Sequence, residues 1–242
     1  MFNSSLLQQP LLSLVIPCYN EGDNVLILIE QLKKIYHKRQ DIEFILVDNG
    51  STDISKKYIK DAVNKNIFIR SVEVPVNEGY GWGITQGLNV AKGIFLGWTH
   101  ADLQTDPYDV LTALNIIEKN ACSPSLYLKG KRKGRSLTDS FFTFSMSIFE
   151  SILFSQKLWD INAQPNIFHH SFYSKWNNPP KDFSLDLYSY ITAKQQNLNV
   201  IRFPVLFTKR IYGKSHWNLD WISKIKFIKR TLYFSFTLKN TQ

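Results

Sequence analysis

Short apolar runs alternate with helical patterns along the first half of the chain. Runs rich in aliphatic and β-branched residues predict strands over residues 11–16, 42–47, 67–74, 94–98 and 125–129. Apolar residues at three- and four-residue steps predict helices over 25–35, from Thr52 or Asp53 onward, over 84–91, and from Pro107 to Lys119. This alternation favours a parallel sheet with right-handed crossovers, and so a doubly wound α/β fold.

The pattern changes beyond residue 135. Residues 137–159 are aromatic and amphipathic, residues 165–170 predict a strand, residues 184–196 a helix, and residues 199–208 one or two strands. No repeat or linker interrupts the chain, and 242 residues with 44% hydrophobic content suffice for one core. We therefore expect a single domain over residues 1–242.

Charge and cysteine content indicate which partners and which cellular compartment the protein has. The 29 basic residues against 20 acidic ones give a net charge of +9, which favours phosphate-bearing partners without choosing among nucleotides, nucleic acids and anionic lipids. Cys18 and Cys122 are too few for a disulfide scaffold and predict buried thiols in a reducing compartment. Residues 1–10 lack a basic leader pattern, and no run reaches the roughly 20 apolar residues of a membrane span. We expect a cytoplasmic protein, with contact to a membrane surface left open.

Polar clusters follow three of the predicted strands, at residues 17–21, 48–53 and 100–107. Ligands of open parallel sheets bind beyond the carboxyl ends of the strands, so these clusters should meet at one edge. Acidic residues there suit a nucleoside diphosphate held through a divalent cation, because carboxylates alone would repel it. A turn followed by a helix cap explains residues 48–53 equally well.

The clusters Pro17-Cys18-Tyr19-Asn20-Glu21, Asp48-Asn49-Gly50-Ser51-Thr52-Asp53 and Ala101-Asp102-Leu103-Gln104 carry a family resemblance. In this order and spacing they resemble family-2 glycosyltransferases with a GT-A fold, most closely the dolichyl-phosphate mannose synthase-like branch. The likeness is strongest over residues 11–135. It implies a Rossmann-like, doubly wound and mostly parallel sheet with helices on both faces and an aromatic-rich C-terminal helical part. Residues 1–135 would then bind a nucleotide-sugar, and residues 136–242 the acceptor.

The resemblance also implies roles for single residues. The nucleoside would be contacted by Pro17, Tyr19, Glu21 and Asp48, while Asp102, also catalytic, and Gln104 would lie at the metal and the diphosphate. The sequence departs from the family at His100, which stands at the first acidic position of the usual Asp-x-Asp motif. As a metal ligand, His100 would favour Mn²⁺ over Mg²⁺. Alternatively, His100 contacts ribose or phosphate and Asp102 holds the cation, which is the reading we favour.

Residues 77–83, with Gly87 beyond, are rich in glycine. They do not form a dinucleotide fingerprint, because that motif needs glycine at Ile84. Glycines here let the backbone approach a sugar-nucleotide or the sheet closely. A similar Asn-x-Gly stretch lines the donor pocket of the resembling family, which implies that Gly79 contacts the donor.

Basic residues form a run over 129–135. A solvated face is one explanation. Likeness to a Gly-x-Arg motif of the family instead implies that Arg132, counted among the catalytic residues, and Arg135 hold phosphate oxygens. Residues 210–215 resemble an Arg-x-x-Gly-x-Ser loop of the family, which implies a phosphate contact for Arg210 and Ser215.

Transfer to a hydroxyl needs a general base, whereas an ionised phosphate acceptor does not. Asp186 aligns loosely with an acidic residue of the family and is our candidate base. Asp182 is its rival, and the start of a helix accounts for either one. Within residues 160–165, Asn162 and Gln164 are candidates for hydrogen bonds to a sugar, and a plain loop ending at Pro165 is the alternative.

The resemblance implies a metal-dependent, inverting glycosyltransferase that uses Mn²⁺ or Mg²⁺ and moves a sugar to a polyprenyl phosphate or another lipid-linked acceptor. One alternative acceptor is a glycan hydroxyl in polysaccharide or lipopolysaccharide synthesis, and a second alternative is a non-catalytic nucleotide-sugar-binding protein. Aromatic and basic residues over 141–154 and 221–234 have the composition of interfacial helices on the inner face of the cell membrane. Core packing or a homo-oligomer interface explains the same aromatics. No motif supports nucleic-acid binding.

Overall fold

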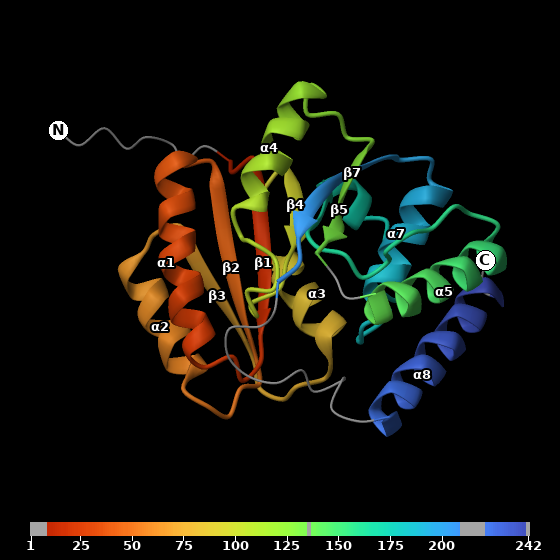
Figure 1. Ribbon diagram of the computed structural model, residues 1–242. Coiled ribbons are helices and arrows are strands. Elements are labelled where there is room, and N and C mark those ends of the chain that lie inside the picture. The colour runs from red at the N-terminus through yellow and green to blue at the C-terminus, as the bar shows by residue number, and fades with distance from the viewer. Residues whose placement is uncertain (1–8, 135–136, 209–220, 241–242) are drawn as a thin grey trace.

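The computed structural model describes residues 9–134, 137–208 and 221–240 (Figure 1). Strands and helices alternate along most of this length. In chain order they are β1 (Leu12–Cys18), α1 (Asp23–Lys38), β2 (Ile42–Asn49), α2 (Ser55–Lys65), β3 (Ile69–Val74), α3 (Tyr80–Val90), β4 (Phe95–Trp98), α4 (Asp109–Lys119), β5 (Leu126–Lys133), α5 (Leu137–Phe154), β6 (Asn166–His169), α6 (His170–Tyr173), α7 (Leu185–Gln195), β7 (Asn199–Leu206) and α8 (Trp221–Asn240).

The strands form one seven-stranded sheet in the order β3-β2-β1-β4-β6-β5-β7. Strands β1 to β4 are mutually parallel where they pair, as the sequence predicts, and β5 pairs with β7 in parallel. Strand β6 runs antiparallel to both β4 and β5, so the sheet is mixed. The second half of the chain thus inserts a strand between two strands of the first half.

Helices cover both faces of the sheet, because successive strand residues point to opposite sides (Figure 1). Leu12, Leu14 and Ile16 of β1 pack in one core with α1, α2 and α4. Val15, between them in sequence, packs in the other core with α3, α6 and α7. Helices α5 and α8 lie side by side at the α7 end of the molecule. The predicted α/β architecture is confirmed.

Several predicted boundaries shift. Helix α2 begins at Ser55 after Ile54, although the Asp53 carboxylate still accepts the Ser55 N–H at 2.9 Å. Helix α3 begins at Tyr80, four residues before the predicted start at Ile84, because its glycines hide the apolar pattern. A Cβ at Gly87 would overlap Val15, so glycine lets α3 lie close against the sheet.

The structure tests the predicted burial of the two cysteines and the expectation that no helix spans a membrane. Cys18 is buried as predicted, whereas Cys122 is partly exposed because it follows α4 at the surface. Within residues 9–134, 137–208 and 221–240, none of the helices combines the length and apolarity needed to span a bilayer.

Candidate active site

The first two polar clusters meet at the carboxyl edge of β1 and β2, which are neighbouring parallel strands. The Thr52 N–H donates to Asn20 Oδ1 at 2.8 Å, and the Asn20 N–H donates to Ser51 Oγ at 3.2 Å. Ser55 Oγ accepts the N–H groups of Glu21 and Gly22. The two loops are therefore one hydrogen-bonded unit, as the carboxyl-edge argument predicts.

The residues expected to contact the nucleoside surround this unit. Asp48 is the next-to-last residue of β2 and is 4% exposed, with Oδ1 accepting the Ser51 N–H at 2.9 Å. Tyr19 is exposed at the rim, Pro17 is half-buried in β1, and Glu21 accepts a hydrogen bond from Asn24 at the start of α1. The Asp48 carboxylate therefore closes a turn within residues 48–53, as the second explanation of this cluster predicts. Turn closure uses one carboxylate oxygen and is compatible with a ligand contact by the other.

The third cluster follows β4, which pairs with β1 on the side opposite β2. Asp102 is 6% exposed, and its Oδ1 accepts the Gln104 N–H at 3.1 Å across Leu103, whose φ of 57° is left-handed. Gln104 Nε2 donates to the Thr208 carbonyl at 3.3 Å, and the Thr208 N–H donates to the Gln104 carbonyl at 2.8 Å. The segment after β7 therefore holds the Asp102 turn in place.

His100, Asp102 and Gln104 supply an imidazole, a carboxylate and an amide at this turn. No group of three or more histidine, cysteine or acidic side chains suited to a metal occurs among the described residues. A cation at Asp102 would be held by that carboxylate, with His100 or Gln104 beside it. This donor set fits Mn²⁺, and an imidazole in the shell would suit Mg²⁺ poorly.

A buried polar network lies beside His100. Asp186, at the start of α7, is 1% exposed, and its Oδ1 accepts hydrogen bonds from Trp98 Nε1 at 3.2 Å, Gln164 Nε2 at 2.9 Å and Asn166 Nδ2 at 3.0 Å. Gln164 Nε2 also donates to the Tyr80 hydroxyl at 2.7 Å. Burial raises the pKa of Asp186, against the lowering influence of Lys129, His100 and the donors from Trp98 and Gln164.

Tyr80 joins this network to the third cluster. Its ring centroid lies 5.5 Å from that of His100, and the ring stacks on Phe183 at 4.6 Å. Asp182, the rival base, instead forms an ion pair with Arg230 of α8 at 3.0 Å and accepts the Ser184 N–H. Of the two candidate bases, Asp186 is therefore the one whose hydrogen bonds lead toward His100.

Gly79 lies where three segments meet. Its φ of 126° excludes most side chains, and a Cβ there would overlap the Lys181 carbonyl. Its carbonyl accepts a hydrogen bond from Asn49 Nδ2 at 3.0 Å, at the end of β2. The structure thus gives this glycine a backbone-packing role, and its contact with a donor sugar stays a prediction.

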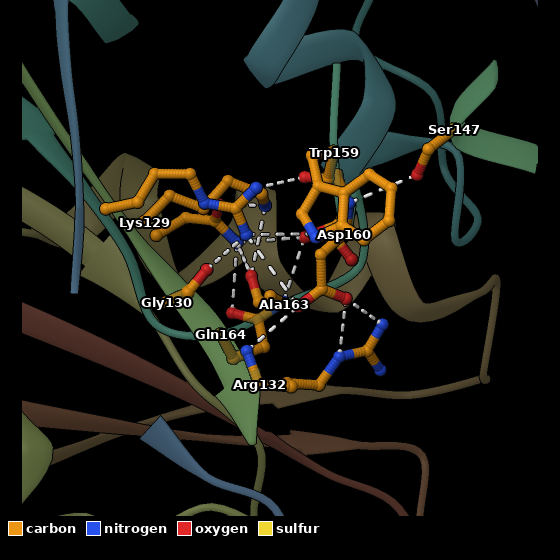
Figure 2. Close-up of polar contacts among 11 residues, drawn as sticks. Lys129, Gly130, Arg132, Ser147, Trp159, Asp160, Ala163 and Gln164 are labelled. Atoms are coloured by element: carbon orange, nitrogen blue, oxygen red, sulfur yellow. Dashed lines mark hydrogen bonds and ion pairs between the residues drawn. The ribbon is translucent and has the colours of Figure 1, made fainter. Parts of the chain in front are cut away.

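Arg132 has a partner that the sequence did not indicate (Figure 2). Its backbone N–H and its Nε donate to the Asp160 carboxylate at 2.9 and 2.8 Å, and the two side chains are 11% and 5% exposed. Arg202 of β7 lies 3.7 Å from the same carboxylate and donates to the carbonyls of Gly130 and Trp159. The Asp160 N–H donates to Ser147 of α5 at 3.1 Å. Asp160 therefore connects β5, β7 and α5, and a phosphate contact by Arg132 stays a prediction.

Asp160→Asn should lower the free energy of unfolding by about 3 kcal/mol at neutral pH, because it leaves two largely buried guanidinium groups without their counter-charge. Burial alone would raise the pKa of Asp160, but the charges of Arg132 and Arg202 and the Arg132 hydrogen bonds lower it overall. This stabilisation is complete above the unfolded-state pKa of about 3.9 and is lost as pH falls through the lower folded-state pKa.

Urea unfolding of both proteins from neutral to acid pH measures the effect, and the difference between them should shrink in acid. Asp61→Asn, on the exposed surface of α2, is the matched control and should change stability by less than about 0.5 kcal/mol. Equal stability of Asp160→Asn and the unmodified protein at neutral pH would show that the ion pair contributes nothing.

The remaining predicted residues fall into two groups. Arg135, Arg210 and Ser215 lie outside the described residues. Gln164 is 1% exposed and bonded to Tyr80 and Asp186, whereas Asn162 is half-buried. The sequence does not indicate Lys129, Asn166, Trp98 or Tyr80 as site residues, and Lys129 stands there only as the first residue of the basic run over 129–135.

Comparison with known proteins identifies the family of this chain. The family model for glycosyl transferase family 2 matches residues 13–175. A dodecaprenyl-phosphate galacturonate synthase of Rhizobium johnstonii is 33% identical over 131 residues, covering 51% of this chain and 36% of that protein. An undecaprenyl-phosphate 4-deoxy-4-formamido-L-arabinose transferase of Proteus mirabilis is 35% identical over 100 residues, covering 40% of this chain and 31% of that protein. The chain thus matches about a third of the length of each relative.

Solved structures share the fold at low sequence identity. A glucosyl-3-phosphoglycerate synthase of Mycobacterium tuberculosis, in complex with Mn²⁺, uridine diphosphate and glucosyl-3-phosphoglycerate, superposes with a TM-score of 0.71 at 12% identity, covering 96% of this chain and 80% of that one. A mannosyltransferase of Pyrobaculum calidifontis, in complex with GDP-mannose and Mn²⁺, gives a TM-score of 0.61 at 18% identity, covering 87% and 59%. The family match spans more than half of the chain, so this protein belongs to glycosyl transferase family 2, with a GT-A fold.

Proposed function

We propose that this protein transfers a sugar from a nucleoside-diphosphate-sugar to a polyprenyl phosphate, with inversion at the anomeric carbon. One observation supports the binding of a nucleoside-diphosphate-sugar donor. Hydrogen bonds join loops 17–21 and 48–53 at the carboxyl edge of the sheet, where Asp102 follows the neighbouring strand β4. Pro17, Tyr19, Glu21 and Asp48 would hold the nucleoside, and the Asp102 turn would hold the diphosphate. Asp102, with His100 or Gln104 beside it, would hold a divalent cation, which would supply positive charge for the leaving diphosphate.

The proposal of a polyprenyl phosphate acceptor is supported by the names of the relatives and by the burial of Asp186. Two relatives are named for dodecaprenyl phosphate and undecaprenyl phosphate, which suggests a polyprenyl phosphate as the acceptor of this protein. A phosphate oxygen is already ionised and attacks without a general base. Such a reaction is compatible with Asp186, the candidate base, being 1% exposed.

A membrane surface would present such an acceptor. Helix α5 exposes Phe144, Ile148 and Ile152 at four-residue steps, and α8 exposes Tyr233 and Phe236. Exposed basic residues Lys229 and Arg230 lie on α8 as well. Apolar and basic side chains on adjacent helices suit the surface of an anionic membrane, which would place the enzyme on its cytoplasmic face. A second copy of the chain is the competing occupant of this surface.

Incubation with labelled uridine, guanosine and thymidine diphosphate-sugars, undecaprenyl phosphate vesicles and Mn²⁺ or Mg²⁺ tests the proposal. We expect a labelled lipid product with at least one donor, and less of it without the metal. Donor binding seen as a rise in melting temperature, but with no nucleoside diphosphate released under any condition, would favour a non-catalytic binding protein instead.

A glycan hydroxyl is the second candidate acceptor, and a specific feature of Asp186 favours it. The hydrogen bonds from Trp98, Gln164 and Asn166 to this carboxylate all end on Oδ1 and so orient it. A general base that takes the proton of a hydroxyl acceptor needs such an oriented carboxylate.

A further inference from the structure

A fully buried lysine lies within the polar network that contains Asp186. Lys129 of β5 is 0% exposed, and its Nζ donates to Asn166 Oδ1 at 2.7 Å and to the Ala163 carbonyl at 3.0 Å (Figure 2). The ammonium also lies 5.4 Å from the centroid of the Tyr190 ring. Burial lowers the pKa of Lys129 to about 7. A charge held this deeply is costly unless an opposite charge lies close by.

Asp186 is that opposite charge, and Asn166 connects the two. Asn166 is 0% exposed, and its amide faces in two directions: Oδ1 accepts from Lys129, and Nδ2 donates to Asp186 Oδ1 at 3.0 Å. A protonated lysine can only donate and an ionised carboxylate can only accept, so in these charge states the pair determines which way the amide points. Asp160 also attracts Lys129, but its carboxylate is already bonded to Arg132.

Other titratable groups act on the pair from several elements. Those that act on Asp186 or respond to its charge are Lys129 and Tyr127 of β5, Tyr80 of α3 and His100 after β4. Those around Lys129 are Asp186, Asp160, Arg132 and Arg202, with the Tyr190 ring beside it. Of the groups that lower the pKa of Asp186, Lys129 has the largest influence.

We propose that Lys129 is a positioning residue for sugar transfer, which acts through Asn166 to keep Asp186 ionised and its carboxylate fixed in the site. This inference rests on the proposed glycosyltransferase function and concerns transfer to hydroxyls, water included. The acceptor oxygen forms a bond to the anomeric carbon, and its proton passes to the Asp186 carboxylate. The bond between the anomeric carbon and the diphosphate oxygen breaks, and its electron pair leaves with the nucleoside diphosphate. Only the ionised carboxylate can take that proton.

Hydrolysis of the donor, which is sugar transfer to water, tests the proposal through its pH profile. In Lys129→Met the loss of the positive charge should raise the pKa of Asp186. The fall of kcat at low pH, the acid limb of the profile, should therefore move to higher pH. We expect kcat to fall about tenfold on that limb and to approach the unmodified value at alkaline pH, with the donor KM changed less than about threefold. Lys60→Met, on the exposed face of α2, should leave the profile unchanged. An unshifted limb in Lys129→Met would overturn the proposal.

A double-mutant cycle in urea gives a second readout that needs no activity. Because each single change leaves the other buried charge alone, the destabilisation in Lys129→Met/Asp186→Asn should be smaller than the sum of the two single losses. Additive losses, or a double variant that does not fold, would overturn the inference. If the unmodified protein hydrolyses and transfers no donor, the proposed function fails, and the cycle still decides whether Lys129 and Asp186 are coupled.

Discussion

Replacing Asp102 with alanine should lower kcat/KM for sugar transfer by about 10³-fold, or about 4 kcal/mol of transition-state stabilisation. Asp102 follows β4 at the centre of the carboxyl edge, and its turn is held by Gln104 and by the segment after β7. Among the three candidate ligands His100, Asp102 and Gln104, Asp102 supplies the carboxylate, so its loss removes the negative charge that they offer the cation. Steady-state kinetics with saturating Mn²⁺ measure the effect.

The matched control is Asp61→Ala on α2, an exposed carboxylate that should leave the rate unchanged. Asp102→Ala should also abolish the metal-dependent rise in melting temperature that a nucleotide-sugar produces. Full stabilisation of this variant, together with unchanged turnover, would place the metal elsewhere.

His100→Gln separates the two readings of that residue within the same experiment. If His100 is a metal ligand, the preference for Mn²⁺ over Mg²⁺ should weaken. If it contacts ribose or phosphate, donor affinity should fall similarly with both metals.

Asp186→Asn should split the two acceptor classes. With a hydroxyl acceptor, including water, we expect kcat to fall by about 10² to 10⁴-fold, because asparagine cannot take the proton. With undecaprenyl phosphate the loss should stay below about tenfold, because that nucleophile arrives ionised. Asparagine keeps an oxygen for the donors from Trp98, Gln164 and Asn166, so the packing around residue 186 is preserved.

Parallel assays with a phosphate and a hydroxyl acceptor measure this split. A large loss with both acceptors would mean that the Asp186 charge is needed for more than proton transfer. A loss that appears in Asp182→Asn instead would move the base to the residue that pairs with Arg230 in the structure.

The sequence predicts the first half of the fold well, because strands and helices there bury regular apolar faces. Its clearest miss is the start of α3, where Gly81 and Gly83 replace the apolar residues that mark a helix. Each of these glycines admits a close neighbour, such as the Asn49 side chain beside Gly83. That requirement depends on tertiary packing and leaves no periodic signal.

The sequence predicts the part of the candidate site that lies at the carboxyl edge of the sheet, but it does not predict the buried polar network around Asp186. Strand-end clusters identify Asp48 and Asp102, because parallel strands bring their carboxyl ends together. Lys129 looked like the first residue of a solvated basic run, yet strand alternation turns it inward to Asn166. Its hydrogen-bond partners, the Ala163 carbonyl and Asn166 of β6, lie 34 and 37 positions later in the chain, and a local pattern cannot show that pairing.

The most direct test of this account is a crystal structure of the protein soaked with Mn²⁺ and the nucleotide-sugar that stabilises it most. The account predicts Mn²⁺ bridging the Asp102 carboxylate and the diphosphate, with the nucleoside between residues 17–21 and Asp48. A nucleotide seated away from the β1, β2 and β4 carboxyl edge, or a cation with no contact to Asp102, would contradict it.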